Sequence, residues 1–107
     1  MMEKLHRVVI TGLGAITPIG NDLDSYLQGL QSGQNGVDQI TLFDAASHAC
    51  RFAAEVKSFD PTGKLEPKES KRWDRFSKFG VIASKEALKH SGLVIDDSNS
   101  DRVGVII

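Results

Sequence analysis

Residues 7–14 read RVVITGLG, and this stretch decides the fold class that the sequence predicts. An apolar, β-branched run from Arg7 to Thr11 ends in Gly12-Leu13-Gly14. Such a run before a glycine turn is typical of a buried strand that leads directly into a loop. We therefore expect an α/β protein whose first strand is Arg7–Thr11.

The segment after this turn predicts a helix from about Asp22 to Ser32. Asn21 is a suitable N-cap residue, and Asp24 places a carboxylate in the first turn, where it interacts favourably with the helix dipole. Gly33 is a natural C-terminal stop. Apolar residues recur at helical spacing: Leu23, Tyr26, Leu27 and Leu30.

The middle of the chain carries weaker patterns. We expect Leu42 and Phe43 to point inward from a loop. Apolar residues alternate over Arg51–Val56 and predict a strand, and Asp60–Gly63 predicts a turn.

A long helix is predicted to begin at Pro67 and to end at Ser91-Gly92. Its buried stripe changes from large to small side chains, so we expect another backbone to approach it closely. The stripe comprises Trp73, Phe76, Gly80, Ala83 and Ala87. After a polar loop, the apolar run Arg102–Ile107 (RVGVII) predicts a second buried strand. We expect the 107 residues to stop inside this strand, as an incomplete part of a larger α/β protein. The alternative is a terminal strand that completes a small sheet.

Composition narrows the function classes. The chain is 40% hydrophobic with a formal net charge of -1, so we expect neither nucleic acid nor membrane as a partner of the chain as a whole. Cys50 is the single cysteine, which excludes an internal disulfide. The run Val8–Ile10 is too short for a signal-peptide core. These features favour the cytoplasm or an equivalent reducing compartment.

Two candidate sites are weak. The glycine turn lacks the third glycine of a dinucleotide-binding G-x-G-x-x-G pattern, because Thr17 stands there. We therefore interpret Gly12-Leu13-Gly14 as a tight turn between a strand and a loop, and expect no cofactor. His48 and Cys50 are too few for a metal site, and we expect Cys50 to be a small buried apolar residue.

A basic cluster is more specific. At about 100° per residue, its cations would share an arc of roughly 120° on one helix. A solvated surface, an acidic protein partner and nucleic acid all remain open, and the acidic protein is favoured over nucleic acid because no exposed aromatics interleave the cations. The cluster comprises Lys64, Lys68, Lys71, Arg72, Arg75 and Lys78.

The order of these elements resembles the start of the β-ketoacyl-acyl-carrier-protein synthases, most closely those of type II. The similar segments cover Leu5–Ile107. They are VVITGLGAITPIGN, the L-x-x-G-x-x-G pattern from Leu30 to Gly36, Phe43-Asp44, RFAAEVKSFD, KRWDRFSKFGVIASKEAL and RVGVII.

The resemblance implies a thiolase-like layered α/β fold, of which residues 1–107 are an incomplete first part of the N-terminal domain. It implies a homodimeric acyltransferase that elongates fatty acyl chains by decarboxylative condensation with malonyl-carrier protein. An enzyme of this family is expected to require neither a metal nor an organic cofactor. The catalytic cysteine and two histidines are expected beyond this chain, so no catalytic residue is assigned within it.

The resemblance also implies that Lys68, Lys71 and Arg72 receive the acidic acyl carrier protein. The alternative is an autonomous module that docks such a carrier protein without catalysis of its own.

Overall fold

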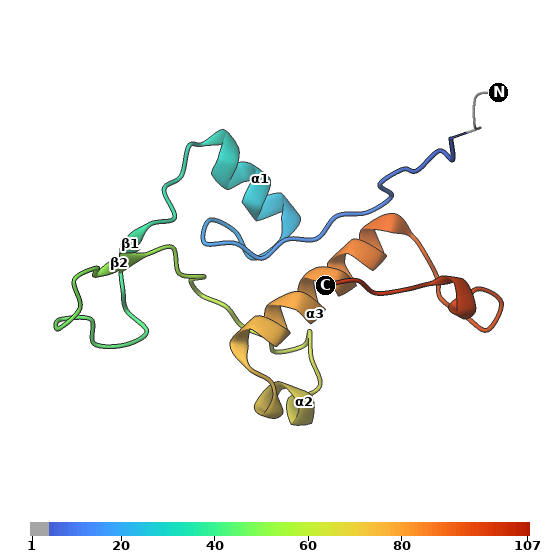
Figure 1. Ribbon diagram of the computed structural model, residues 1–107. Helices are drawn as coiled ribbons and strands as arrows, with labels where there is room; N and C mark the ends of the chain where they lie inside the picture. Colours follow the sequence, from blue (N-terminus) through green and yellow to red (C-terminus); the bar gives the residue numbers. More distant parts are fainter. Residues whose placement is uncertain (1–4) are drawn as a thin grey trace.

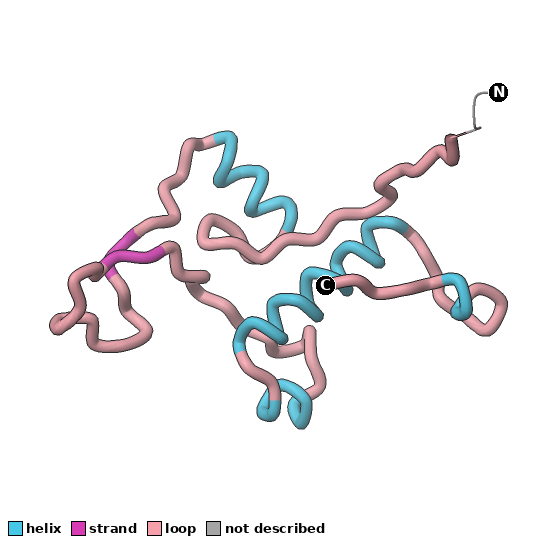
Figure 2. The backbone as a smooth tube through the Cα atoms, viewed as in Figure 1, coloured by secondary structure: helices cyan, strands magenta, loops and turns pink. Residues whose placement is uncertain are grey.

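The computed structural model describes residues 5–107. Its longest element, α3, lies in the middle, and the other elements are arranged around it (Figure 1). Much of the chain between them is loop (Figure 2). The elements in order are α1 (Leu23–Gln31), β1 (Asp38–Gln39), β2 (Phe52–Ala53), α2 (Pro67–Arg72), α3 (Arg75–Ser91) and the 3₁₀ turn η1 (Ser100–Arg102).

The glycine turn lies directly on the backbone of α3. A Cβ atom added to Gly12 would overlap the carbonyl oxygen of Ala87 and lie 2.7 Å from the amide nitrogen of Ser91. A Cβ atom on Gly14 would overlap the carbonyl oxygen of Ala83. Only glycine permits so close an approach. The prediction that the small-residue stripe admits another backbone is confirmed, whereas the packing role of the two glycines was not predicted from the sequence.

Two side chains of α3 accept hydrogen bonds from the segment that follows the glycine turn. The half-buried carboxylate of Glu86 accepts from the amide of Ala15 through Oε2 (2.9 Å) and from the amide of Leu23 through Oε1 (2.7 Å). Nδ1 of His90 accepts from the amide of Leu13 (3.0 Å). Glu86 therefore joins the loop and the first residue of α1 to α3.

Helix α1 agrees with the predicted helix to within one residue at each end. Its N-cap is Asp22 rather than the predicted Asn21. Oδ1 of Asp22 accepts from the amide of Ser25 (2.7 Å), and Oγ of Ser25 accepts from the amide of Asp22 (3.2 Å). This reciprocal pair is a capping box. The amide of Ser25 holds the pKa of Asp22 below its ordinary value.

The predicted strands Arg7–Thr11 and Arg102–Ile107 are wrong for the described residues. Within residues 5–107 neither segment pairs with another strand, and both are exposed, with Val8 at 89% and Ile106 at 99%. The apolar pattern reports which residues suit a strand. A strand also needs a hydrogen-bonded neighbour, and the described chain places none beside either segment.

The sheet in the described residues is a short antiparallel pair of β1 and β2. The prediction of a strand over Arg51–Val56 is thus confirmed only over β2. Leu42 and Phe43, expected to point inward, are both more than half exposed because the loop between the strands extends away from α3. The register pairs Asp38 with Ala53 and Gln39 with Phe52.

The predicted helix Pro67–Ser91 is two helices. Trp73 and Asp74 have extended backbones, with ψ values of 142° and 161°, and they separate α2 from α3. Asp74 is the N-cap residue of α3, a position that aspartate favours. Apolar spacing did not reveal the break, because the stripe continues in sequence across it. The predicted stop is confirmed, since Gly92 ends α3 with a φ of 69°.

Few apolar side chains are buried in the described chain. Ala45, Leu65 and Ile82 are the buried ones among residues 5–107. The radius of gyration is 18.1 Å, whereas a compact domain of this length has about 13 Å. The described residues therefore do not share one core.

This exposure generates a prediction for the 107-residue polypeptide by itself. We expect it to bind a hydrophobic dye, to associate as its concentration rises and to unfold without a cooperative thermal transition, because its apolar segments lack cover. Dye fluorescence, light scattering and calorimetry measure these three properties. A sharp transition in a clean monomer would contradict the expectation.

A second prediction concerns the carboxylate of Glu86. In a longer polypeptide that contains this segment and unfolds cooperatively, Glu86→Ala should lower the free energy of unfolding by about 2 kcal/mol, because two amides lose a charged acceptor. Amide exchange at Ala15 and Leu23 should accelerate. The matched control is Glu69→Ala on α2, whose carboxylate makes no hydrogen bond within residues 5–107 and should change stability by less than about 0.5 kcal/mol. Equal effects of the two variants would refute the role of Glu86.

Candidate functional site

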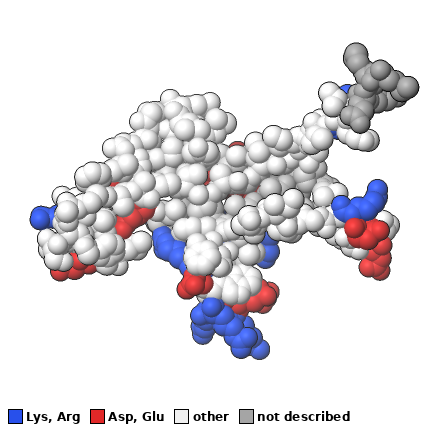
Figure 3. Space-filling model, viewed as in Figure 1, with Lys and Arg blue, Asp and Glu red and all other residues white. Residues whose placement is uncertain are grey.

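The three cations singled out by the resemblance lie together on α2. Lys68, Lys71 and Arg72 fall within an arc of about 100° at the usual helical spacing, and all three are exposed. We call them the α2 basic face. Lys and Arg atoms gather over α2 at the lower edge of the molecule, with acidic atoms beside them (Figure 3).

The α2 basic face makes no ion pair among the described residues. The ion pair found within residues 5–107 joins Lys57 to Asp38, with 3.8 Å between nitrogen and oxygen. Neither residue belongs to α2. The cations of the face are therefore available to an acidic partner, and its geometry suits a surface contact rather than an enclosed binding site.

The predicted six-cation arc is wrong, because α2 and α3 are separate helices. Lys78, half-buried, and Arg75 both belong to α3. Arg75 is the first residue of that helix. Its guanidinium donates to the carbonyl of Val56 and lies 5.6 Å from the ring centre of Phe59 and 5.2 Å from that of Phe79. The two rings meet edge to face at 4.8 Å. Arg75 thus anchors the segment before α2 to α3.

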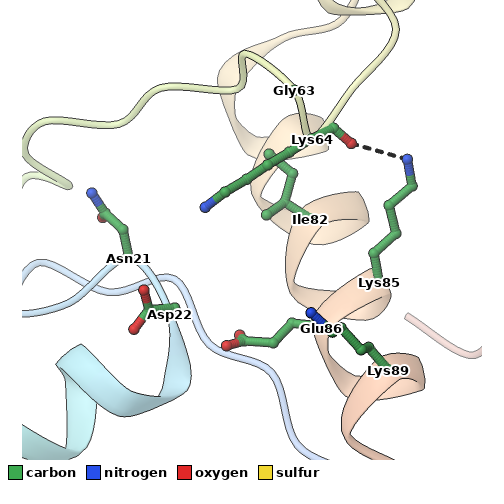
Figure 4. A pocket seen from close by; sticks show the side chains of 8 residues that line it. All are labelled: Asn21, Asp22, Gly63, Lys64, Ile82, Lys85, Glu86 and Lys89. Carbon is green, nitrogen blue, oxygen red and sulfur yellow. Dashed lines mark hydrogen bonds between the residues drawn. The ribbon is translucent and has the colours of Figure 1, made fainter. Parts of the chain in front are cut away.

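Lys64 also belongs elsewhere. It lines a hollow of about 410 Å³ between the start of α1, the turn before α2 and α3 (Figure 4). Its carbonyl accepts from Nζ of Lys85 (3.0 Å), and the hollow's two carboxylates, Asp22 and Glu86, already accept from backbone amides. This hollow is a junction of three segments. Its lining residues are Asn21, Asp22, Gly63, Lys64, Ile82, Lys85, Glu86 and Lys89.

A smaller hollow of about 230 Å³ lies beside α2, and we call it the α2 hollow. Lys71 lines it, so it adjoins the α2 basic face. The sequence analysis missed it, although the predicted turn Asp60–Gly63 marked one of its walls. Its lining residues are Pro61, Thr62, Gly63, Leu65, Pro67, Ser70 and Lys71.

Cys50 is exposed, which corrects the expectation of a buried apolar residue. It lies in a loop just before β2, where its thiol donates to the carbonyl of Phe52 (3.5 Å). The ring of His48 packs against Phe43, with 5.5 Å between ring centres. No thiol–imidazole hydrogen bond and no group of three potential metal ligands occur in the described part of the chain.

None of the helices described in residues 5–107 combines the length and hydrophobicity that a membrane crossing requires.

Comparison with known proteins gives consistent matches. The chain is 57% identical over 106 residues to 3-oxoacyl-(acyl-carrier-protein) synthase 2 of Synechocystis sp., covering 99% of this chain and 25% of that protein. The synthases of the same name from Coxiella burnetii and Staphylococcus aureus are 45% and 41% identical, with 25% and 26% of their lengths covered. The chain thus spans about a quarter of the length of these curated relatives.

A solved structure and a family model agree with these relatives. The structure titled "The ishigamide ketosynthase/chain length factor" superposes on 83% of this chain and 22% of its own, with a TM-score of 0.68 and 32% identity. The model of the beta-ketoacyl synthase N-terminal domain matches residues 5–107. Since this match covers every described residue, the chain belongs to the beta-ketoacyl synthase family and falls within its N-terminal domain.

Proposed function

We propose that this chain is the N-terminal part of a 3-oxoacyl-(acyl-carrier-protein) synthase of type 2, which elongates fatty acyl chains. The observation that carries the proposal is the 57% identity to the Synechocystis synthase along 106 residues. The proposed enzyme needs no metal and no organic cofactor. It works in the cytoplasm or in the stroma of a plastid.

In the proposed reaction a cysteine thiolate attacks the acyl thioester of one carrier protein and releases that carrier's thiol. The malonyl group of a second carrier loses carbon dioxide, and its α-carbon attacks the enzyme-bound thioester. The products are a 3-oxoacyl carrier thioester and the free cysteine. Donors to the thioester oxygens, from two histidines, stabilise the developing negative charge.

These catalytic residues lie outside residues 1–107 in the proposal. Its support within the chain is that the available side chains have other surroundings: Cys50 is on an exposed loop, His48 packs on Phe43, and His90 accepts from the glycine turn. The chain supplies instead the first part of a thiolase-like layered fold. Arg7–Thr11 and Arg102–Ile107 become paired strands there, which would cover the apolar side chains that the described chain exposes.

The chain's own functional contribution in this proposal is the α2 basic face, which receives the acidic acyl carrier protein. Its support is the exposure of all three cations and the absence of carboxylate partners within residues 5–107. Opposite charge speeds encounter and orients the partner, while salt screens the attraction.

A second candidate is an autonomous module that docks an acidic carrier protein without catalysis. The same basic face favours it. Assays of condensation separate the two. We expect the full-length homodimeric synthase to convert acyl- and malonyl-carrier proteins to the 3-oxoacyl product with release of carbon dioxide, and residues 1–107 alone to release none. A full-length protein that binds carrier protein without turnover would favour the module.

The docking face can be tested by charge reversal. Lys68→Glu combined with Arg72→Glu in the full-length protein should weaken carrier binding by about tenfold or more at low salt, because two attractive contacts become repulsive. The salt dependence of binding should flatten. Calorimetry or surface binding at several salt concentrations measures both effects.

The matched control is Lys89→Glu combined with Arg102→Glu. It makes the same change in net charge on two exposed residues, one in the last turn of α3 and one in η1 beyond it. Binding should change less than about twofold, since screening weakens charges separated by more than about 10 Å. An unchanged dissociation constant for the Lys68 and Arg72 variant at low salt would reject the docking role.

A further inference from the structure

We infer that the α2 hollow is the apolar half of the carrier-docking surface and takes one aliphatic side chain from the acidic face of the carrier protein. The inference rests on the proposed function. It adds a second, apolar contact to the carrier-docking site that the α2 basic face forms. Docking then combines three cations on α2 with an apolar recess beside them.

The recess is built from two prolines around a buried leucine. Leu65 is only 6% exposed, and Pro61 and Pro67 flank it in sequence on either side. An aliphatic side chain that enters would remove the apolar atoms of these walls from water, which favours binding.

Charge complementarity identifies the occupant. The seven lining residues of the α2 hollow include Lys71 and no carboxylate. A side chain that enters therefore meets no carboxylate in the wall, and the exposed surface around it carries the three cations of the α2 basic face against two carboxylates, Glu66 and Glu69. The larger hollow does not suit such a partner, because the carboxylates of Asp22 and Glu86 lie in its wall.

An apolar recess also supplies what the cations lack. Exposed charges chiefly set the rate and orientation of encounter. Anchors that slow dissociation are side chains held in desolvated pockets at the centre of an interface. The α2 hollow lies beside the cations that would steer the carrier, so one orientation of the partner can use both.

The test fills the recess without changing charge. In the full-length protein, Ser70→Phe, and separately Thr62→Leu from the opposite wall, should weaken carrier binding about tenfold through faster dissociation. The slope of log Kd against log salt should stay unchanged, since the α2 basic face is intact. Ser84→Phe on α3 is the matched control, because Ser84 is exposed and lines neither hollow. It should leave binding unchanged.

A measurement on the unaltered protein removes any dependence on how the variants fold. Carrier protein titrated into full-length protein with labelled leucine methyl groups should shift the signals of Leu65 at low and moderate salt alike. Unshifted Leu65 signals at saturation, or unchanged binding in both filled variants, would overturn the inference.

The outcomes also separate the inference from the proposed function. If charge reversal at Lys68 and Arg72 weakens binding while filling the recess does not, the basic face docks the carrier and the α2 hollow does not. If neither charge reversal nor salt affects carrier binding, the docking role of α2 itself fails.

Discussion

The arrangement of the described chain depends on one carboxylate, that of Glu86 on α3. Its two oxygens accept amide hydrogens from Ala15 and Leu23, which stand at different points of the segment after the glycine turn. The contact is possible only because Gly12 and Gly14 allow that segment to lie on the backbone of α3. Loss of either condition would remove the hydrogen bond that joins the first residue of α1 to α3, and the described residues share no large apolar core that could replace it.

The separation of α2 from α3 has a similar importance for the candidate site. Six cations follow one another closely in the sequence, yet they have different roles. Arg75 lies against two aromatic rings, and Lys64 belongs to the junction at the start of α1. Lys68, Lys71 and Arg72 remain together on α2, beside the small hollow that Lys71 also lines. The break at Trp73-Asp74 thus turns a long charged helix into a compact basic face and an anchored helix.

The proposed function explains two features together: the apolar segments that the described chain exposes, and the match to only about a quarter of each relative. Both follow if the chain is the N-terminal part of a longer synthase. In that proposal, a chain that spans about a quarter of the length of its relatives contributes surfaces rather than a complete site. The proposed docking face requires only exposed cations on a short helix, which local sequence can provide. The proposed nucleophile and oxyanion donors require distant segments to converge, and such convergence needs most of a fold.

The sequence by itself determined the local elements and the family. It predicted α1, the end of α3, the small-residue stripe and the cations of the basic face, because caps, helical spacing and residue type act within a few residues of each other. The tertiary structure alone decided which apolar runs are paired, where the long helix breaks, that Cys50 is exposed, and which cations remain free on the surface. Those outcomes depend on partners far along the chain, such as Val56 for Arg75 and Ala87 for Gly12, and residue patterns carry no record of such partners.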